Sequence, residues 1–415
     1  MKNIVILLIP LMLFACMARQ KETDFVSDNF SFAEEQLTFA LIEMREAIKN
    51  ESEESKRKRT QKGWSELVSP RSLREDGSLI MVPTKDWCSG FFPGELWYMY
   101  EYTRDDKWLE LAHRHTIALE REKYNNTTHD MGFKIFCSYG NGYRLTKNSS
   151  YKSVLLEAAE TLISRYDPKV GCIRSWDNVG GGRWKYPVII DNMLNLELLF
   201  WASTVTGDGK YRDIAVRHAE MTLKNHFRED NSSYHVVDYD SQSGEVLVKE
   251  THQGYDHESA WSRGQVWGLY GFTMCYRETG NIAFLEQALK ISDFIFSHPA
   301  LPSDLVPYWD YNAPNIPHEP RDVSAATCTA SALYELSILD PENALLHRHR
   351  ADEIIQNITK NYRSEIGSHK GFLLHSSTGA KMLNFEIDKP LVYADYYFLE
   401  ALNRLRKIEE GNPVL

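Results

Sequence analysis

A repeated pair of helical segments restricts the fold of this chain more than any other feature. In each pair, an apolar or aromatic segment ends in a short polar turn, and a more amphipathic segment follows. Five pairs are visible: 96–103 with 107–119, 133–146 with 150–163, 193–206 with 210–223, 264–279 with 282–296, and 324–339 with 343–358. A first helix over 32–48 and a last helix over 391–405 complete a sixth pair.

Self-similarity with an irregular period of roughly 40 to 70 residues indicates a repeat architecture. The apolar helix of each pair can be buried only against neighbouring pairs. We therefore predict an all-α fold, an (α/α)6 toroid of six helical hairpins whose apolar helices lie inside. Two strand-like stretches, 234–239 and 245–250, predict a small β-hairpin on a loop at the mouth where the inner helices begin.

The chain divides into three regions. Residues 1–16 contain Lys2, an apolar run too short to cross a bilayer, and the ending Leu13-Phe14-Ala15-Cys16, which resembles a bacterial lipobox. We predict a lipoprotein signal peptide with a lipidated Cys16, a tether over 17–30, and a single domain over 31–415, since no linker interrupts the rest. The predicted location is the bacterial cell envelope, as a periplasmic or outer-membrane lipoprotein held only by its lipid anchor.

Charge and cysteine content exclude several classes of function. A formal net charge of −11 argues against nucleic acid as a partner, because binding to phosphate backbones relies on clustered Lys and Arg. After Cys16, five cysteines remain without any C-x-x-C spacing, which indicates buried thiols instead of disulfides or a zinc site. His252 and His257 also lack ligand partners at the usual spacings, so we predict no metal and no cofactor.

Asp191 is the carboxylate whose setting is most unusual. It lies between the apolar residues 188–190 and a helix that is apolar on most of its circumference, so burial is expected. A buried carboxyl without an adjacent cation tends to keep its proton, as a general acid must at neutral pH. The alternative is that Asp191 caps the helix and accepts a hydrogen bond from the amide of Leu194.

Residues at the starts of the inner helices are able to meet in a central pocket. They include two carboxylates, a guanidinium, a histidine and two indoles, a set that suits an acidic sugar. They are Trp87, His129, Asp130, Asp191, Asn192, Trp261, Arg263 and Gln265. The β-hairpin would overhang this mouth and could place His235 or His252 over a ligand.

Several separated motifs together resemble the unsaturated glucuronyl hydrolases of glycoside hydrolase family 88. They are Trp87-x-Ser89-Gly90-Phe91-x-Pro93-Gly94, His129-Asp130-Met131-Gly132-Phe133, Ser138-Tyr139-Gly140-Asn141-Gly142-Tyr143, Ser259-x-Trp261-x-Arg263-Gly264-Gln265-x-Trp267-Gly268 and Tyr393-Ala394-Asp395-Tyr396-Tyr397. The resemblance covers nearly the whole chain after the tether. It implies an α/α toroid acting on oligosaccharides that carry a 4,5-unsaturated uronic acid at the non-reducing end.

The resemblance also implies a reaction and the residues that perform it. The C4=C5 vinyl ether is hydrated, and the resulting hemiketal opens to a keto product and releases the neighbouring sugar. Asp191 would be the general acid and base, and Asp130 the second carboxylate. The substrate-binding residues would be Trp87, His129, Asn192, His235, His252, Gln253, Trp261, Arg263, Gln265 and Trp267. Arg263 would hold the uronate carboxylate bidentately.

Each assignment has a structural alternative. Asp130 could cap the helix that begins at Met131, and His235 could face solvent. Trp261 and Trp267 could belong to the core, and Arg263 could pair with Asp256 or Glu258.

Other functions also stay open at this point. One rival is an unsaturated rhamnogalacturonyl hydrolase acting on pectin fragments, although Trp261 with Arg263 and the run from His129 to Phe133 favour the glucuronyl group. The others are an ordinary glycosidase and a non-catalytic glycan-binding lipoprotein. Ser376-x-x-Gly379-x-Lys381 only partly resembles a sulfate-handling arrangement of the family, because its second serine is missing.

Overall fold

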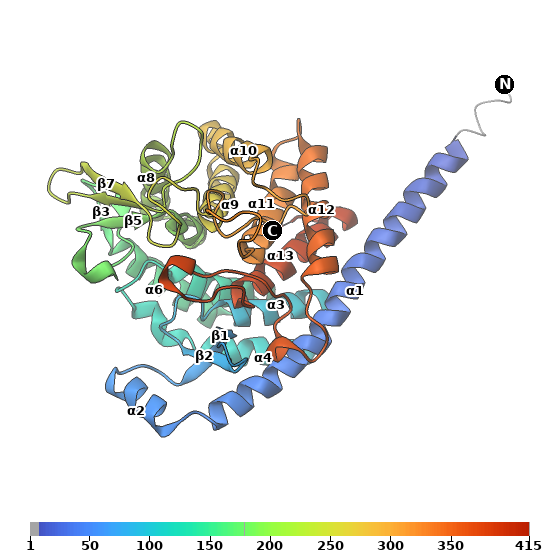
Figure 1. Cartoon of the computed structure of the whole chain (residues 1–415), viewed down its shortest axis with the longest axis horizontal. Coiled ribbons are helices and arrows are strands. Elements are labelled where there is room, and N and C mark those ends of the chain that lie inside the picture. Colours follow the sequence, from blue (N-terminus) through green and yellow to red (C-terminus); the bar gives the residue numbers. More distant parts are fainter. Residues whose placement is uncertain (1–7, 178, 415) are drawn as a thin grey trace.

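The inner helices form a closed ring. The computed structural model describes the backbone of residues 8–177 and 179–414 and the side chains of residues 25–177 and 181–414 (Figure 1). The ring consists of α3 (Phe91–Thr103), the π-helix η2 (Gly132–Gly140) with α5 (Asn141–Thr146), the 3-10 helix η4 (Ile190–Asn195) with α7 (Leu196–Thr206), α9 (Ser262–Thr279), α11 (Val323–Leu339) and α13 (Val392–Glu410). Each contacts the next, and α13 contacts α3. The predicted (α/α)6 toroid is confirmed.

The outer helices pack on the inner ones one by one. They are α4 (Asp106–Ile117), α6 (Ser149–Ile163), α8 (Gly209–Asn225), α10 (Ile282–Ser297), α12 (Ala344–Asn361) and α1 (Leu8–Lys49), which contacts α13. Burial follows the sequence pattern, because α11 is buried continuously from Val323 to Leu336, whereas α4 buries Trp108, Ala112 and Thr116 on one face. The polar turns supply helix caps: Asp105, Asn148, Asp208 and Asn281 each accept a hydrogen bond from the amide two residues later.

The β-hairpin is confirmed, and it carries a third strand. Strands β6 (Val236–Tyr239) and β7 (Val246–Glu250) are antiparallel, and β5 (Pro187–Ile189) pairs with the other edge of β6. Ile189 pairs with Val236, and the amide of Ile190 donates to the carbonyl of His235 at 3.1 Å. This pairing brings the segment before Asp191 against the segment that contains His235.

The region from 50 to 85 is more ordered than the sequence suggested. The sequence analysis assigned no helix or strand to this region, which contains Pro70 and Pro83, but the structure has helix α2 (Glu53–Gln61) and an antiparallel hairpin of β1 (Leu67–Leu73) and β2 (Leu79–Pro83). Proline is tolerated in a two-stranded sheet because each strand has a free edge. The remaining short elements are η1 (Glu120–Tyr124), β3 (Tyr166–Asp167), β4 (Cys172–Ile173), η3 (Val179–Gly182), η5 (His369–Gly371) and η6 (Lys381–Leu383).

The N-terminal helix α1 starts before the predicted domain boundary. Its first half projects away from the body in Figure 1, and its second half lies against it. The stretch predicted as a tether is helical, and Val26 and Phe30 at its end are buried, so packing begins before residue 31. Residues 1–7 and the side chain of Cys16 lie outside the described part of the chain. No helix in the described part is long and apolar enough to cross a membrane.

The cysteine prediction holds for the part of the chain whose side chains are described. All five cysteines after Cys16 are free thiols: Cys88, Cys172, Cys275 and Cys328 are buried, and Cys137 is half-buried.

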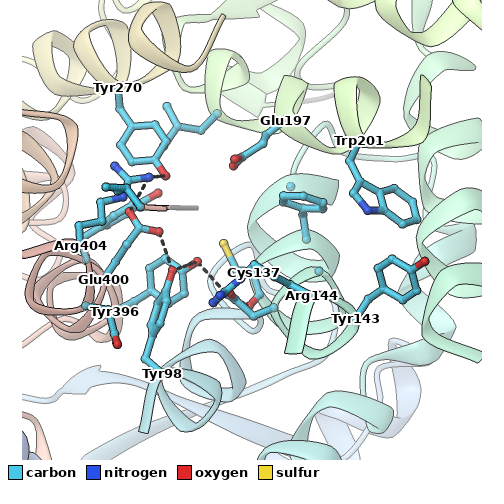
Figure 2. Close-up of a pocket in the computed structure, with 18 of the residues that line it drawn as sticks. Tyr98, Cys137, Tyr143, Arg144, Glu197, Trp201, Tyr270, Tyr396, Glu400 and Arg404 are labelled. Atoms are coloured by element: carbon cyan, nitrogen blue, oxygen red, sulfur yellow. Dashed lines mark hydrogen bonds and ion pairs between the residues drawn. The ribbon is translucent and has the colours of Figure 1, made fainter. Parts of the chain in front are cut away.

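The two ends of the toroid differ. The predicted site residues lie at the end where the inner helices begin, whereas a cavity of about 330 Å³ occupies the other end. Figure 2 shows Tyr98, Glu400 and Arg404 on one side of this cavity and Tyr143 and Trp201 on the other. Most of its charged groups are paired with one another, as in Arg144 with Glu101 and Arg277 with Glu197, both at 2.5 Å. None of the predicted site residues lines it.

Candidate active site

Asp191 lies in the first turn of η4, directly after strand β5. Its Oδ2 atom is buried and has no hydrogen-bond partner. The N-cap residue of η4 is Ile189, which makes no side-chain cap bond, so the helix-cap alternative for Asp191 is wrong. The carboxyl group is held in place by the strand pairing and the short helix, and it is free to act on a ligand.

The environment of Asp191 favours its protonated form. Burial raises the pKa of Asp191 to about 7, against the opposing influence of the Arg263 charge. The carboxylate of Asp130 raises this pKa further, whereas the indole N–H of Trp267 lowers it. A carboxyl group with this pKa can deliver a proton near neutral pH and can also take one back.

His235 points at Asp191 in a single tautomer. Its Nδ1 accepts hydrogen bonds from the amides of His252 and Gln253 at 3.1 and 3.2 Å, so the proton of the neutral ring must be on Nε2. Burial lowers the pKa of His235, which keeps the ring neutral. Nε2 lies 3.6 Å from Oδ2 of Asp191 and has no partner. The prediction that His235 belongs to the site is consistent with this geometry, and the solvent-facing alternative is wrong.

Asp130 and His129 form the second polar group of the site. Oδ2 of Asp130 accepts from the hydroxyl of Thr128, and its Oδ1 lies 3.2 Å from Nε2 of His129. His129 is buried, and burial lowers its pKa. The side-chain contacts of Asp130 are thus Thr128 and His129, and no helix amide among the described residues donates to its carboxylate, so its side chain does not cap the helix that begins at Met131.

Asn195 joins the two carboxylate segments, and the sequence analysis missed it. Its Oδ1 accepts from the amides of Gly132 and Phe133 at 2.7 and 3.2 Å, and its Nδ2 donates to the carbonyl of Asp191 at 3.4 Å. A Cβ atom on Gly132 would lie 2.6 Å from Cα of Asn195, so only glycine allows this approach. The available signal was a buried asparagine inside an otherwise apolar helix.

Aromatic rings surround these polar groups. Trp267 packs on Phe133 with ring centroids 5.5 Å apart, and Trp87 packs on Phe133 at 5.4 Å and on Tyr393 at 4.9 Å. Trp261 lies 4.7 Å from the ring of His235. Trp261 and Trp267 are both buried, as the core alternative required, yet each has an indole N–H without a partner.

Arg263 has contacts other than those predicted. Nη1 donates to Oδ2 of Asp322 at 2.6 Å and to the carbonyl of Thr378 at 2.7 Å, and Nη2 donates to the carbonyl of Gly379. These contacts use both N–H groups of Nη1 and one of Nη2, so among the contacts of the described residues the Nε–H and the second N–H of Nη2 are left for a uronate carboxylate, and the bidentate role of Arg263 stays a prediction. The salt-bridge alternative named the wrong partners, because the carboxylate is Asp322 and not Asp256 or Glu258.

Three other predicted residues make hydrogen bonds within the protein. Gln265 is fully buried, and its side-chain amide forms hydrogen bonds with Ser233 and with the carbonyl of Trp261. It therefore positions the segments around the site and is not exposed to a ligand. Asn192 donates to the carbonyl of Ile173 at 2.9 Å and leaves its Oδ1 without a partner. Gln253 donates to the carbonyl of Gly379 at 3.3 Å.

His252 belongs to an aromatic cluster that the sequence analysis missed. Its ring lies 5.4 Å from Trp176 and 5.6 Å from Trp184, and Trp176 also contacts His235 at 5.8 Å. The signal was available in the sequence as two tryptophans on either side of a run of three glycines.

Unsatisfied polar atoms concentrate at this site. Six buried side-chain atoms of predicted residues make no hydrogen bond of standard geometry, although some lie close to one another: Nδ1 of His129, Oδ2 of Asp191, Oδ1 of Asn192, Nε2 of His235, and Nε1 of Trp261 and Trp267. Buried polar groups are normally paired, so such a cluster indicates groups that await a polar ligand. In the described residues, no three His, Cys, Asp or Glu side chains are grouped so as to hold a metal ion.

The fold and the site together define a class of protein: a toroid of helical hairpins with two carboxylates, one of them able to stay protonated, among aromatic rings. This combination suits an enzyme that acts on carbohydrate. Comparison with known proteins agrees, since residues 64–334 match the model of Glycosyl Hydrolase Family 88.

Similar proteins identify the family more closely. The chain is 47% identical over 342 residues to the unsaturated glucuronyl hydrolase of Formosa agariphila, covering 82% of this chain and 85% of that protein. It is 32% identical over 341 residues to the unsaturated chondroitin disaccharide hydrolase of Streptococcus agalactiae, covering 79% and 83%. The crystal structure of an unsaturated glucuronyl hydrolase specific for heparin matches with a TM-score of 0.83 and 43% identity, covering 92% of this chain and 98% of that one. The chain belongs to glycoside hydrolase family 88, the family of the unsaturated glucuronyl hydrolases.

Proposed function

We propose that this enzyme hydrates the C4=C5 double bond of a 4,5-unsaturated uronic acid at the non-reducing end of lyase-generated, glycosaminoglycan-type oligosaccharides. The observation that carries the proposal is the buried Oδ2 of Asp191, which has no hydrogen-bond partner in a carboxyl group whose pKa is about 7. The 47% identity to an unsaturated glucuronyl hydrolase supports the same substrate class.

The reaction begins with proton transfer from Oδ2 of Asp191 to C4. The π electrons of the C4=C5 bond form the new C4–H bond, and positive charge is shared between C5 and the ring oxygen. A water molecule then forms a C–O bond at C5 and gives its proton to the Asp191 carboxylate. The hemiketal opens by breaking the bond between C5 and the ring oxygen, which leaves a ketone at C5. The hemiacetal at C1 then releases the neighbouring sugar and becomes an aldehyde.

The other polar groups hold the sugar and stabilise charge. We infer that Asp130 supports the developing positive charge, because a carboxylate near a cationic transition state lowers its free energy. The donors available to an anionic sugar are Nε2 of His235, Nε1 of Trp261 and the two N–H groups of Arg263 that its contacts with Asp322, Thr378 and Gly379 leave over. Trp87, which is only partly buried, supplies a flat face for the C–H groups of the ring.

The test is the loss of ultraviolet absorbance of the conjugated double bond when the protein is mixed with lyase-generated disaccharides. Asp191→Asn should lose about two to four orders of magnitude in rate while ligand affinity and melting temperature are kept. Asp208→Asn is the matched control, because Asp208 is a true N-cap on α8 and Asn caps almost as well. An Asp191→Asn protein with more than about a tenth of the wild-type rate would exclude Asp191 as the acid.

The substrate panel separates the remaining alternatives. Turnover of unsaturated pectin fragments in preference to glycosaminoglycan fragments would indicate a rhamnogalacturonyl hydrolase. Turnover of saturated uronides would indicate an ordinary glycosidase. Binding without any turnover would indicate a non-catalytic glycan-binding lipoprotein.

We also propose that Cys16 is lipidated and that the enzyme is a lipoprotein of the bacterial cell envelope. The ending Leu13-Phe14-Ala15-Cys16 after an apolar run supports this. Native protein should fractionate with membranes, and Cys16→Ser should release it without changing its rate. A soluble native protein whose mature N-terminus lies elsewhere would disprove lipidation.

A further inference from the structure

A second concave surface lies next to the candidate active site, between α2 and the hairpin of β1 and β2. We call it the α2 groove. Its volume is about 590 Å³. Leu67, Met81, Val82 and Pro83 give it an apolar floor, and Trp64 lies at its side. An apolar floor with an indole suits the C–H faces of sugar rings.

The charges around the α2 groove favour an anion. Four cationic side chains and two carboxylates line it: Lys58, Arg59, Lys62, Lys85, Glu54 and Asp86. Lys58 pairs with Glu54 at 2.6 Å, and Asp86 pairs with Arg71 at 2.8 Å, so neither carboxylate neutralises the remaining lysines.

Because Arg59 pairs with Glu51 and Glu66, each at 2.9 Å, Lys62 and Lys85 are the two cations left for a ligand. Both side chains are exposed, and among the residues described here no carboxylate forms an ion pair with either. Their Nζ atoms lie 4.4 and 4.8 Å from the ring centre of Trp64. The two ammonium groups therefore stand beside one indole ring, and an anion there would meet positive charge on a chain whose net charge is −11.

The α2 groove is continuous in sequence with the wall of the active site. Lys85 lies two residues before Trp87, so their Cα atoms are at most about 7 Å apart. Trp87 packs on Phe133, and Phe133 packs on Trp267, whose indole N–H lowers the pKa of Asp191. A chain that leaves Asp191 past Trp87 would therefore enter the α2 groove next.

Three other cations near the mouth are already neutralised. Arg183 pairs with Glu250 at 2.7 Å, Arg228 pairs with Glu258 at 3.2 Å, and Lys381 pairs with Glu319. The charge distribution thus favours the α2 side for an acidic oligosaccharide.

We propose that the α2 groove is a distal subsite for the anionic remainder of the oligosaccharide, beyond the sugars held at Asp191. This inference rests on the proposed function, and it adds a preference for substrates longer than a disaccharide. The apolar floor contacts the sugar rings, and Lys62 and Lys85, which lie over the ring of Trp64, bind their carboxylate or sulfate groups. The contribution of the lysines is exposed to solvent, so salt weakens it.

The experiment compares two lengths of the same ligand. In the Asp191→Asn background, which prevents turnover, binding of unsaturated di- and tetrasaccharides from lyase-digested heparin is measured by calorimetry. Adding Lys62→Gln with Lys85→Gln should weaken tetrasaccharide binding about fivefold or more, as expected for two exposed charge contacts. Disaccharide binding should not change, and the tetrasaccharide advantage should shrink at high salt.

A matched control and a separate rate assay keep the outcomes distinct. Lys147→Gln should change neither affinity, because Lys147 lies over the ring of Tyr143 beside the cavity at the opposite end of the toroid. Equal effects of the double lysine variant on both ligands, no effect on either, or no binding of the tetrasaccharide would overturn the subsite. Absence of turnover by the protein with Asp191 intact would instead overturn the proposed function, and the binding comparison would still decide the α2 groove.

Discussion

The carboxyl group of Asp191 is buried, and its Oδ2 atom has no hydrogen-bond partner. Such an arrangement costs stability, because the ionised form must give up its solvation without compensation. The raised pKa is the physical response, since the folded protein keeps the proton to a pH of about 7. The same property would make Asp191 a proton donor to carbon and would tie both stability and rate to pH.

The first prediction concerns stability. The folded state binds the Asp191 proton more tightly than the unfolded state does. The stabilisation that comes from this tighter binding is therefore complete below the unfolded pKa near 3.8 and is lost as pH rises through about 7. Asn does not titrate. Between pH 5 and pH 8, the free energy of unfolding of Asp191→Asn should therefore gain on the order of 2 kcal/mol relative to wild type. Denaturant titrations at the two pH values measure this gain, and Asp208→Asn should show none.

The second prediction concerns rate. If the protonated Asp191 starts the reaction, kcat/KM should fall about tenfold for each pH unit above about 7. A profile that stays flat to pH 9 would show that the proton comes from another group.

The third prediction concerns Arg263, which is buried against Asp322 at 2.6 Å. Arg263→Ala leaves that carboxylate buried and unpaired, so it should cost about 3 to 5 kcal/mol of stability. It also removes a positive charge that lowers the pKa of Asp191, so the alkaline fall in kcat/KM should move to higher pH. A change in KM alone, with stability and pH profile unchanged, would restore the role of direct carboxylate binding.

At the scale of elements, the site depends on two short irregular helices at the starts of the inner helices. The π-helix η2 and the 3-10 helix η4 approach so closely that Gly132 touches Asn195. The side chain of Asn195 satisfies two amides of η2, and this contact fixes how the Asp130 segment lies relative to Asp191. π-helices are rare and are often found at functional sites, as here.

The fourth prediction follows from that contact. Gly132→Ala would place Cβ 2.6 Å from Cα and 2.8 Å from Oδ1 of Asn195, so one of the two helices must move. A displacement of about 1 Å between catalytic groups can cost about a hundredfold in rate. We expect that loss in kcat with a smaller change in KM. Gly209→Ala on α8 is the control, because its nearest neighbour is 3.9 Å away and the rate should be unchanged.

At the scale of the whole molecule, one core extends through all six hairpins, and the N-terminal helix is part of it. Val26, Phe30 and Leu37 of α1 are buried, and Phe30 stacks on Tyr102 with ring centroids 3.9 Å apart. α1 closes the ring of outer helices by packing on α13. Its packed part is therefore a structural element of the toroid.

The fifth prediction tests where the folded unit begins. Removing residues 1–24 should leave the melting temperature and the rate unchanged. Removing residues 1–31 deletes Val26 and Phe30 from the core and should cost about 3 to 5 kcal/mol, the range for losing one large buried aromatic side chain. Equal stability of the two truncated proteins would place the packed boundary after residue 31.

The architecture could be predicted from the sequence because it follows from local patterns. The alternation of apolar and amphipathic helices determines which helix is inner, and the Asp and Asn turns determine where the outer helices begin. The apolar setting of Asp191 likewise predicted its burial and its raised pKa. The π-helix η2 and the hairpin of β1 and β2 were missed, because the apolar periodicity of the sequence does not distinguish a π-helix from an α-helix or this short hairpin from a loop.

Only the tertiary structure decided which side chains already form hydrogen bonds or ion pairs within the protein. Arg263 has the right chemistry for a uronate, but Asp322 is 59 residues away in sequence, and only folding shows that it binds one side of the guanidinium. Gln265 was placed in the site by its position, and its amide is instead committed to Ser233 and Trp261. Asn195 bridges two segments that are 63 residues apart. Periodicity reports which face of a helix is buried, whereas hydrogen bonds between distant segments depend on how the ring closes, and no local pattern encodes that.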